Sequence, residues 1–278
     1  MLDSKFAMEL PPIIPTLTSQ DLKDLRYAKM LLENPGFAAR MANLLGGPIE
    51  KGFALLPRGW SATVHKATKA ALFRSVQVAV STLGRNTRKR SSERFHKLLV
   101  GASGGVGGVF GLAALPIELP ISTTIMLRSI ADIARSEGHP INTLDTKLNC
   151  LEVFALGGPP RGDDAAESGY WAVRVTLAKT ISEAASYILE KGIIEESAPA
   201  IVRLITAIAS RFGTVVSEQV AAKAVPLVGA AAGSVINVLF IDHFQDMARG
   251  HFIVRRLEAQ YGSEMVRNVY DSLAIPLS

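Results

Sequence analysis

The feature that most constrains this chain is a run of twenty residues without a charged side chain, from 98 to 117, which contains six glycines. Glycines four residues apart lie on nearby faces of a helix and let two backbones approach closely. That spacing occurs three times in the run and once more in a second apolar stretch. We therefore expect two central glycine-rich apolar helices that pack together through Gly101, Gly104, Gly105, Gly107, Gly108, Gly111, Gly229 and Gly233.

Two interpretations of the uncharged run stay open. Twenty apolar residues are nominally long enough to cross a hydrocarbon core of ~30 Å. However, each glycine costs a helix about 1 kcal/mol relative to alanine, and glycine adds little hydrophobicity. The run is therefore either a buried core helix or hairpin, or a segment that contacts a membrane.

Six cationic side chains, called the basic cluster below, come directly before this run: Arg85, Arg88, Lys89, Arg90, Arg94 and Lys97. An anionic cytoplasmic membrane surface attracts such residues by roughly 1 kcal/mol each. Nucleic acid is not the expected partner, because Phe95 is the only interleaved aromatic residue and no nucleic-acid module is recognised. The expected partner is an anionic membrane surface or a membrane protein.

Helical patterns and helix-stop signals run through the rest of the chain, and no convincing strand pattern occurs. A capping box at Thr18 and Asp21 begins the first helix. Only 6% of the residues are aromatic although 48% are hydrophobic, so small aliphatic side chains supply most of the core. We predict an all-α, single-domain helical bundle over residues 19–278, preceded by a lead-in over residues 1–18. Further helices are expected at 60–83, 118–137, 142–156, 169–191, 197–224, 226–261 and from 263 onward.

The compartment is predicted from cysteine usage and the N-terminus. Cys150 is the only cysteine, so no intrachain disulfide can form, which fits a reducing compartment. The first fifteen residues lack a basic segment followed by an apolar one, so no signal peptide is expected. We predict a cytoplasmic protein, peripheral at the inner face of the membrane.

Glu118 is the first candidate for chemistry, because it is an acid in the apolar segment LPIELPIS. It could act as a general acid or a ligand. Alternatively, Pro116 opens a helix and Glu118 offsets the helix dipole in the first turn. Pro120 leaves a third arrangement open, in which the helix begins there.

Asp242 and Asp246 lie four residues apart and would share a helix face. With a histidine from another segment they could bind a metal, and Glu93 with His96 has the spacing found in di-iron bundles. Such a site needs two of these motifs and two further glutamates, and here the second would run in reverse, from His243. We therefore expect a solvated helix face with no metal, and no cofactor either, because phosphate-loop and dinucleotide patterns are absent.

Two segments resemble the EcsC family. The first, from 101 to 138, has a glycine-rich stretch, an acidic-Leu-Pro turn at Glu118, and a Leu-Arg-x-Ile-x-x-Ile-Ala helix that contains Arg128. The second, from 225 to 262, is similar to the family's C-terminal helix with its pattern Pro-x-x-Gly-x-x-x-Gly-x-x-x-Asn, which ends here at Asn237. The likeness covers roughly residues 20 to 270. The family's turn usually begins with aspartate, and this chain has glutamate there.

The resemblance implies an all-helical protein of a mainly bacterial family whose biochemical activity is not established. The family's namesake is encoded beside an ABC transporter, which suggests membrane-linked work, and no catalytic residue carries over. Asn237, a polar residue in an apolar helix, is expected to face Glu118 or Arg128 in the core.

Three functions are consistent with these patterns. The favoured one is a non-enzymatic, membrane-proximal accessory protein that docks through the basic cluster and the glycine-rich hairpin. The second is an enzyme or a metal-binding domain that uses Glu118, Arg128, Asn237, Asp242 and Asp246. The third is a carrier of a lipid or another hydrophobic ligand in an apolar cavity between glycine-lined helices. The patterns leave the substrate and the oligomeric state open.

Overall fold

The computed structural model describes residues 17–33, 37–45, 49–82, 114–158, 169–192, 194–225 and 230–274. These residues form ten helices and no strand, which confirms the predicted all-α class. In chain order the helices are α1 (Ser19–Glu33), α2 (Phe37–Leu45), α3 (Glu50–Ala54), α4 (Trp60–Thr82), α6 (Leu115–Ser136), α7 (Leu144–Leu156), α8 (Gly169–Lys191), α9 (Pro199–Ala224), α10 (Ala230–Tyr261) and α11 (Ser263–Ser272). The basic cluster, the glycines from 101 to 111 and Gly229 lie outside the described residues, and so does the expected packing of two glycine-rich helices.

Local capping signals set several helix ends where the sequence predicts them. The Thr18 hydroxyl accepts a hydrogen bond of 3.1 Å from the Asp21 amide and donates one of 2.6 Å to its carboxylate. Thr143 caps α7 by accepting a 3.3 Å hydrogen bond from the Thr146 amide. Gly262 separates α10 from α11 with a φ of 87°, a backbone conformation that favours glycine.

The start of α6 decides between the arrangements left open for Glu118. The helix begins at Leu115, with Pro116 among its first residues and Glu118 in its first turn. Proline is tolerated there because the first backbone amides of a helix have no partner within the helix. Pro120 lies inside the helix and does not open it.

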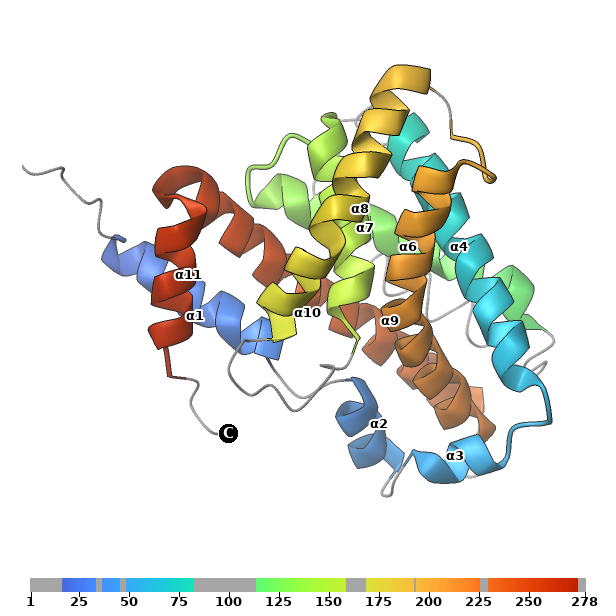
Figure 1. Cartoon of the computed structure of the whole chain (residues 1–278). Helices are drawn as coiled ribbons and strands as arrows, with labels where there is room; N and C mark the ends of the chain where they lie inside the picture. Colours follow the sequence, from blue (N-terminus) through green and yellow to red (C-terminus); the bar gives the residue numbers. More distant parts are fainter. Residues whose placement is uncertain are drawn as a thin grey trace, which may run out of the picture.

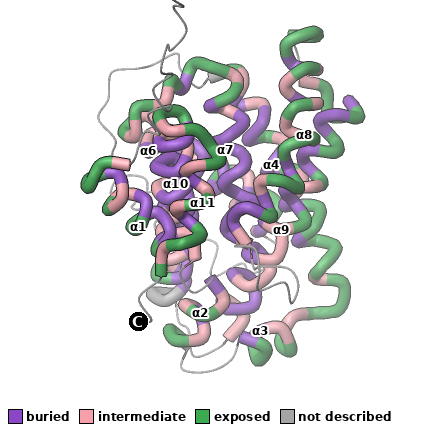
Figure 2. Tube along the Cα trace, turned by 60° about the vertical axis from the view of Figure 1, so that its left-hand side comes forward, coloured by how far each residue is buried: buried purple, intermediate pink, exposed green. Residues whose placement is uncertain are grey.

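The 32-residue helix α10 is the longest described helix and packs against most of the others (Figure 1). It packs against α1, α2, α6, α7, α9 and α11, whereas α4 packs against α6, α7 and α9. Buried residues lie on the inward faces of these helices and exposed residues on the outside (Figure 2). The helices therefore share one apolar core.

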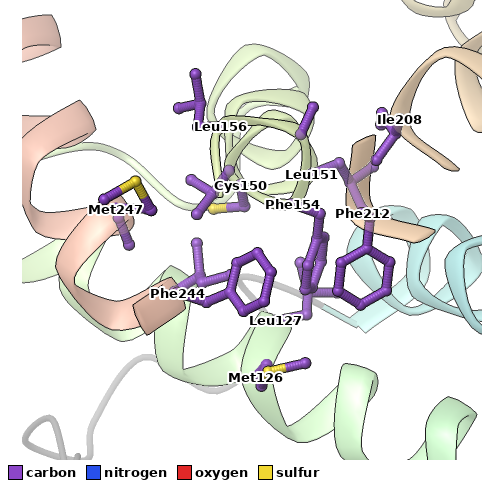
Figure 3. Close-up of a cluster of buried hydrophobic side chains, with 14 of the residues drawn as sticks. Met126, Leu127, Cys150, Leu151, Phe154, Leu156, Ile208, Phe212, Phe244 and Met247 are labelled. Carbon is purple, nitrogen blue, oxygen red and sulfur yellow. The ribbon is translucent and has the colours of Figure 1, made fainter. Parts of the chain in front are cut away.

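Phenylalanine rings from three helices meet in this core (Figure 3). Phe154 of α7 lies 5.0 Å from Phe212 of α9 and 5.7 Å from Phe244 of α10, between ring centroids, and the latter two are 5.4 Å apart. Cys150 packs in the same cluster, fully buried, and burial raises the pKa of its thiol. A protonated, inaccessible thiol behaves as a small hydrophobic side chain.

Two short helices, α2 and α3, were not predicted from the sequence, and tertiary contacts explain them. Helices of nine and five residues are marginal in isolation. Both pack on α9, and α2 also packs on α10. Gly52 in α3 is buried against α9, where a Cβ would clash with the carbonyl group of Ala221. Gly52 therefore permits close approach of α3 to α9, although it is not one of the glycines whose four-residue spacing predicted close packing.

Candidate functional site

Glu118, at the start of α6, lies among polar side chains from α9 and α10. Lys223 Nζ donates a hydrogen bond of 2.9 Å to Glu118 Oε1, and Asn237 Nδ2 donates one of 3.4 Å to the same oxygen. The Asn237 Oδ1 atom accepts a 2.8 Å hydrogen bond from Gln219 Nε2. We call these four residues the Glu118 cluster.

The cluster is largely shielded from solvent. Asn237 and Gln219 are buried, and the side chains of Glu118 and Lys223 are only 13% and 17% exposed. A carboxylate in such a position is tolerable because a lysine offsets its charge and amide groups supply hydrogen bonds. The cluster is a polar junction that fixes α6, α9 and α10 relative to one another. Of the two partners expected for Asn237, the structure provides Glu118.

The other predicted polar residues do not join this cluster. Arg128 is exposed on α6, which contradicts a place for it in the polar core. Asp246 instead forms an ion pair with Arg40 of α2, whose two terminal nitrogens lie 3.1 and 3.2 Å from Oδ2. Asp242 and Asp246 are both half-buried, so the expected solvated face is wrong for these two residues.

The metal-site hypothesis finds no support where it can be examined. Within the described ranges, no group of three or more His, Cys, Asp or Glu side chains could hold a metal ion. His243 is buried, and its Nε2 atom donates a 2.7 Å hydrogen bond to the Gly157 carbonyl. Burial lowers the pKa of His243 to about 4, so the ring is neutral and has a packing role. Glu93 and His96 lie outside the described residues.

A second polar site, which the sequence did not predict, opens between α7, α8, α10 and α11. It is a cavity of about 470 Å³, called the polar cavity below. Its walls combine three arginines and four carboxylates with four apolar side chains. The lining residues are Asp145, Asn149, Glu152, Trp171, Arg174, Val175, Ala178, Ile181, Arg255, Glu258, Ser263, Glu264 and Arg267.

A chain of contacts runs behind this cavity. Arg174 forms a bidentate ion pair with Glu258 at 2.8 and 2.9 Å, and donates a 3.3 Å hydrogen bond to the Tyr170 hydroxyl. That hydroxyl lies 3.1 Å from His251 Nδ1. The carboxyl group of Glu152 on the other side of the ring favours a proton on Nε2, so the hydroxyl donates to Nδ1. The neutral ring then carries its proton on Nε2, which lies 3.6 Å from Glu152 Oε2.

Burial perturbs the titration of this site. It raises the pKa of Glu152 to about 7, although the nearby Arg174 and Arg255 oppose the rise. It lowers the pKa of His251 well below its ordinary value, and the same two arginines add to that effect. At neutral pH the imidazole is uncharged, while Glu152 is divided between its carboxyl and carboxylate forms.

Part of the polar cavity was visible in the sequence. His251, Arg255 and Glu258 follow one another at helical spacings of four and three, and Tyr170 and Arg174 are four apart. Polar stripes of this kind on apolar helices mark faces that meet another polar group. Which stripes meet depends on how α7, α8 and α10 cross, and the local sequence does not contain that information.

An exposed apolar feature lies near the Glu118 cluster. Ile117 and Ile121, one turn apart on α6, are 72% and 53% exposed. Arg128 lies seven residues beyond Ile121 and therefore projects from the same side of the helix. Single exposed apolar side chains are common on proteins, whereas two isoleucines one turn apart on the same face, beginning at the last residue of the uncharged run, form a small exposed apolar patch.

One helix among the described residues, α9, is long and apolar enough to cross a membrane. In its most apolar window 44% of the residues are buried inside the bundle. Phe212 of α9 also belongs to the aromatic core cluster. Core helices of water-soluble proteins meet the same criteria, so this helix is weak evidence for a span.

Comparison with known proteins identifies a family. The model of the EcsC protein family matches residues 19–257, which is most of the chain. No curated protein and no solved structure gives a match. The family match spans both the Glu118 cluster and all of the polar cavity except its α11 wall and the end of α10.

Proposed function

The chain belongs to the EcsC protein family, and from that premise we propose that it is a helical accessory protein that docks peripherally on the anionic inner surface of a membrane. The observation that carries the proposal is the exposure of Ile117 and Ile121 on α6. Ile117 is the last residue of the uncharged run, which follows the six cations of the basic cluster, and Ile121 lies one turn beyond it. Cations beside an apolar surface are the combination by which peripheral proteins bind anionic lipid.

The charged residues on α6 also favour docking through this surface. Glu118 is the only acidic residue from 98 to 131, and Lys223 offsets its charge at 2.9 Å. Binding to an anionic surface is therefore not opposed by repulsion from an unpaired carboxylate beside Ile117. Arg128, exposed on the same side of α6, adds a cation to those of the basic cluster. Each such cation near an anionic surface contributes roughly 1 kcal/mol of binding, screened by salt.

Docking is favoured over the other two functions considered. The carboxylates proposed for an enzyme or metal site do not converge: Glu118 pairs with Lys223, and Asp246 pairs with Arg40. A carrier of hydrophobic ligands needs an apolar cavity, whereas nine of the thirteen residues that line the polar cavity, in the described part of the chain, have charged or polar side chains.

Liposome co-sedimentation tests the proposal. We expect the protein to sediment with vesicles containing phosphatidylglycerol, to sediment much less with pure phosphatidylcholine, and to be released by high salt. The triple charge reversal R88E/K89E/R90E should abolish sedimentation. A matched reversal of three exposed lysines elsewhere, K51E/K66E/K179E, should weaken it far less.

The apolar contribution is tested by I117S/I121S, with V175S/L189S as the control, because Val175 and Leu189 are 64% and 75% exposed on α8. Only the first pair should reduce binding. If the protein does not bind anionic vesicles, or if charge reversal in the basic cluster changes nothing, the docking proposal fails.

A further inference from the structure

Glu152 is a buried carboxylic acid at the wall of the polar cavity. It lies in α7, where every residue from Leu148 to Leu156 is buried. Within the described part of the chain no hydrogen bond reaches its carboxylate, and its one ion-pair contact is His251 Nε2 at 3.6 Å. Buried polar groups normally have a hydrogen-bond partner, so the donor to this carboxyl group comes from water or from a ligand in the cavity.

The charges around the cavity indicate the sign of that donor. Three arginines line it, and three carboxylates other than Glu152 offset them: Arg174, Arg255 and Arg267, and Asp145, Glu258 and Glu264. Arg174 is held tightly by Glu258, and Arg255 lies 3.6 Å from Asp145. When Glu152 ionises, it therefore adds one negative charge that the cavity itself does not offset.

We propose that the polar cavity binds a small organic cation, an alkylammonium or amidinium, whose charged group donates a hydrogen bond to Glu152. The site is separate from the membrane-docking surface on α6 and does not depend on it. Its apolar wall, formed by Trp171, Val175 and Ile181, receives the carbon chain of the ligand. A volume of about 470 Å³ is within the ordinary range for small-molecule sites.

Cation binding is coupled to the titration of Glu152. Burial raises the pKa of this group to about 7, and a cation binds only the ionised form. The affinity should therefore rise about tenfold between pH 6 and pH 8, as the ionised fraction rises from about a tenth to nine tenths. The other charged or titratable groups around Glu152 come from all four helices: Asp145, Arg174, His251, Arg255, Glu258, Glu264 and Arg267.

Ligand-observed NMR titration of the full chain tests the proposal with three matched probes: n-butylammonium, butanoate and butan-1-ol. We expect n-butylammonium to bind, about tenfold more tightly at pH 8 than at pH 6, and the other two to bind at least tenfold more weakly. If butanoate or butan-1-ol binds as well as the cation, or if no probe binds, the proposal is wrong.

Three variants locate the site. E152Q keeps the shape of the side chain and removes its charge, so it should weaken n-butylammonium binding at least tenfold and abolish its pH dependence. A178W fills the cavity at an exposed lining position and should block binding while Glu152 remains in place. E196Q, at an exposed carboxylate that does not line the cavity, should change affinity less than threefold. Unchanged binding in both E152Q and A178W, with thermal unfolding like that of the wild type, would overturn the assignment.

Discussion

The Tyr170 hydroxyl lies 3.1 Å from His251 Nδ1, and this contact ties α8 to α10 through two buried rings. Eighty-one residues separate the two in sequence. The contact fixes the tautomer of His251 and so turns its Nε2 proton toward Glu152. The environment of Glu152 thus depends on a hydrogen bond made on the opposite side of the imidazole.

Replacing Tyr170 with phenylalanine tests that dependence. Y170F leaves a buried imidazole nitrogen without its donor, and we expect the free energy of unfolding to fall by about 1–3 kcal/mol. Chemical denaturation measures the change, with Y187F as the control at a half-buried tyrosine. The ¹⁵N chemical shift of Nδ1 should also move in Y170F. A hydroxyl that contributes nothing would leave both measurements unchanged.

The pH dependence of stability should reveal the buried acid. Because folding raises the pKa of Glu152 from 4.5 to about 7, the folded state binds its proton more tightly than the unfolded chain. The resulting stability is complete below pH 4.5 and is lost as the pH rises through 7, at a cost of about 3 kcal/mol. His243 acts in the opposite sense, because its lowered pKa of about 4 removes stability as the pH falls below 6.5.

Comparing E152Q with the wild type isolates the Glu152 effect. The unfolding free energy of E152Q relative to the wild type should rise between pH 4.5 and pH 8 and should level off above that. Urea denaturation at half-unit pH steps measures the difference curve. A difference that stays constant over this range would show that Glu152 titrates alike in the folded and unfolded states.

The pairing of Glu118 with Lys223 should contribute measurably to stability. We expect E118Q and K223M each to lower the free energy of unfolding by about 1–2 kcal/mol, and the double variant to lose less than the sum. The coupling energy should be about 1 kcal/mol. The exposed pair Arg203 and Glu183 serves as the comparison cycle, where a coupling below ~0.5 kcal/mol is expected. Equal couplings in the two cycles would argue against a structural role for the Glu118 cluster.

Gly52 should tolerate no side chain. A Cβ there would clash with the backbone carbonyl of Ala221 in α9, which a rotamer change cannot relieve. We expect G52A to destabilise the protein by about 1–3 kcal/mol despite the better helix propensity of alanine. G213A is the matched control, because its Cβ would meet only a Thr68 methyl at 3.9 Å, and it should be neutral or stabilising by up to ~1 kcal/mol. Thermal melts of the two variants decide the matter.

Much of the fold was predictable because helix ends are local. Thr143 before α7 and Gly262 after α10 act through hydrogen bonds and backbone angles within a few residues. The contact of Asn237 with Glu118 was also predictable, because a buried amide in an apolar helix requires a polar partner. Helices α2 and α3 were not predictable, because their stability comes from packing on α9.

The sequence by itself determined that this chain is helical, where most of its helices begin and end, and that its positive charge gathers before an uncharged run. Only the tertiary structure decided that Arg128 faces outward and that Glu152, Tyr170 and His251 meet at one cavity. The physical reason is range. Caps and periodicity act within one or two turns, whereas the polar cavity depends on the angles at which four helices cross, and the whole core sets those angles.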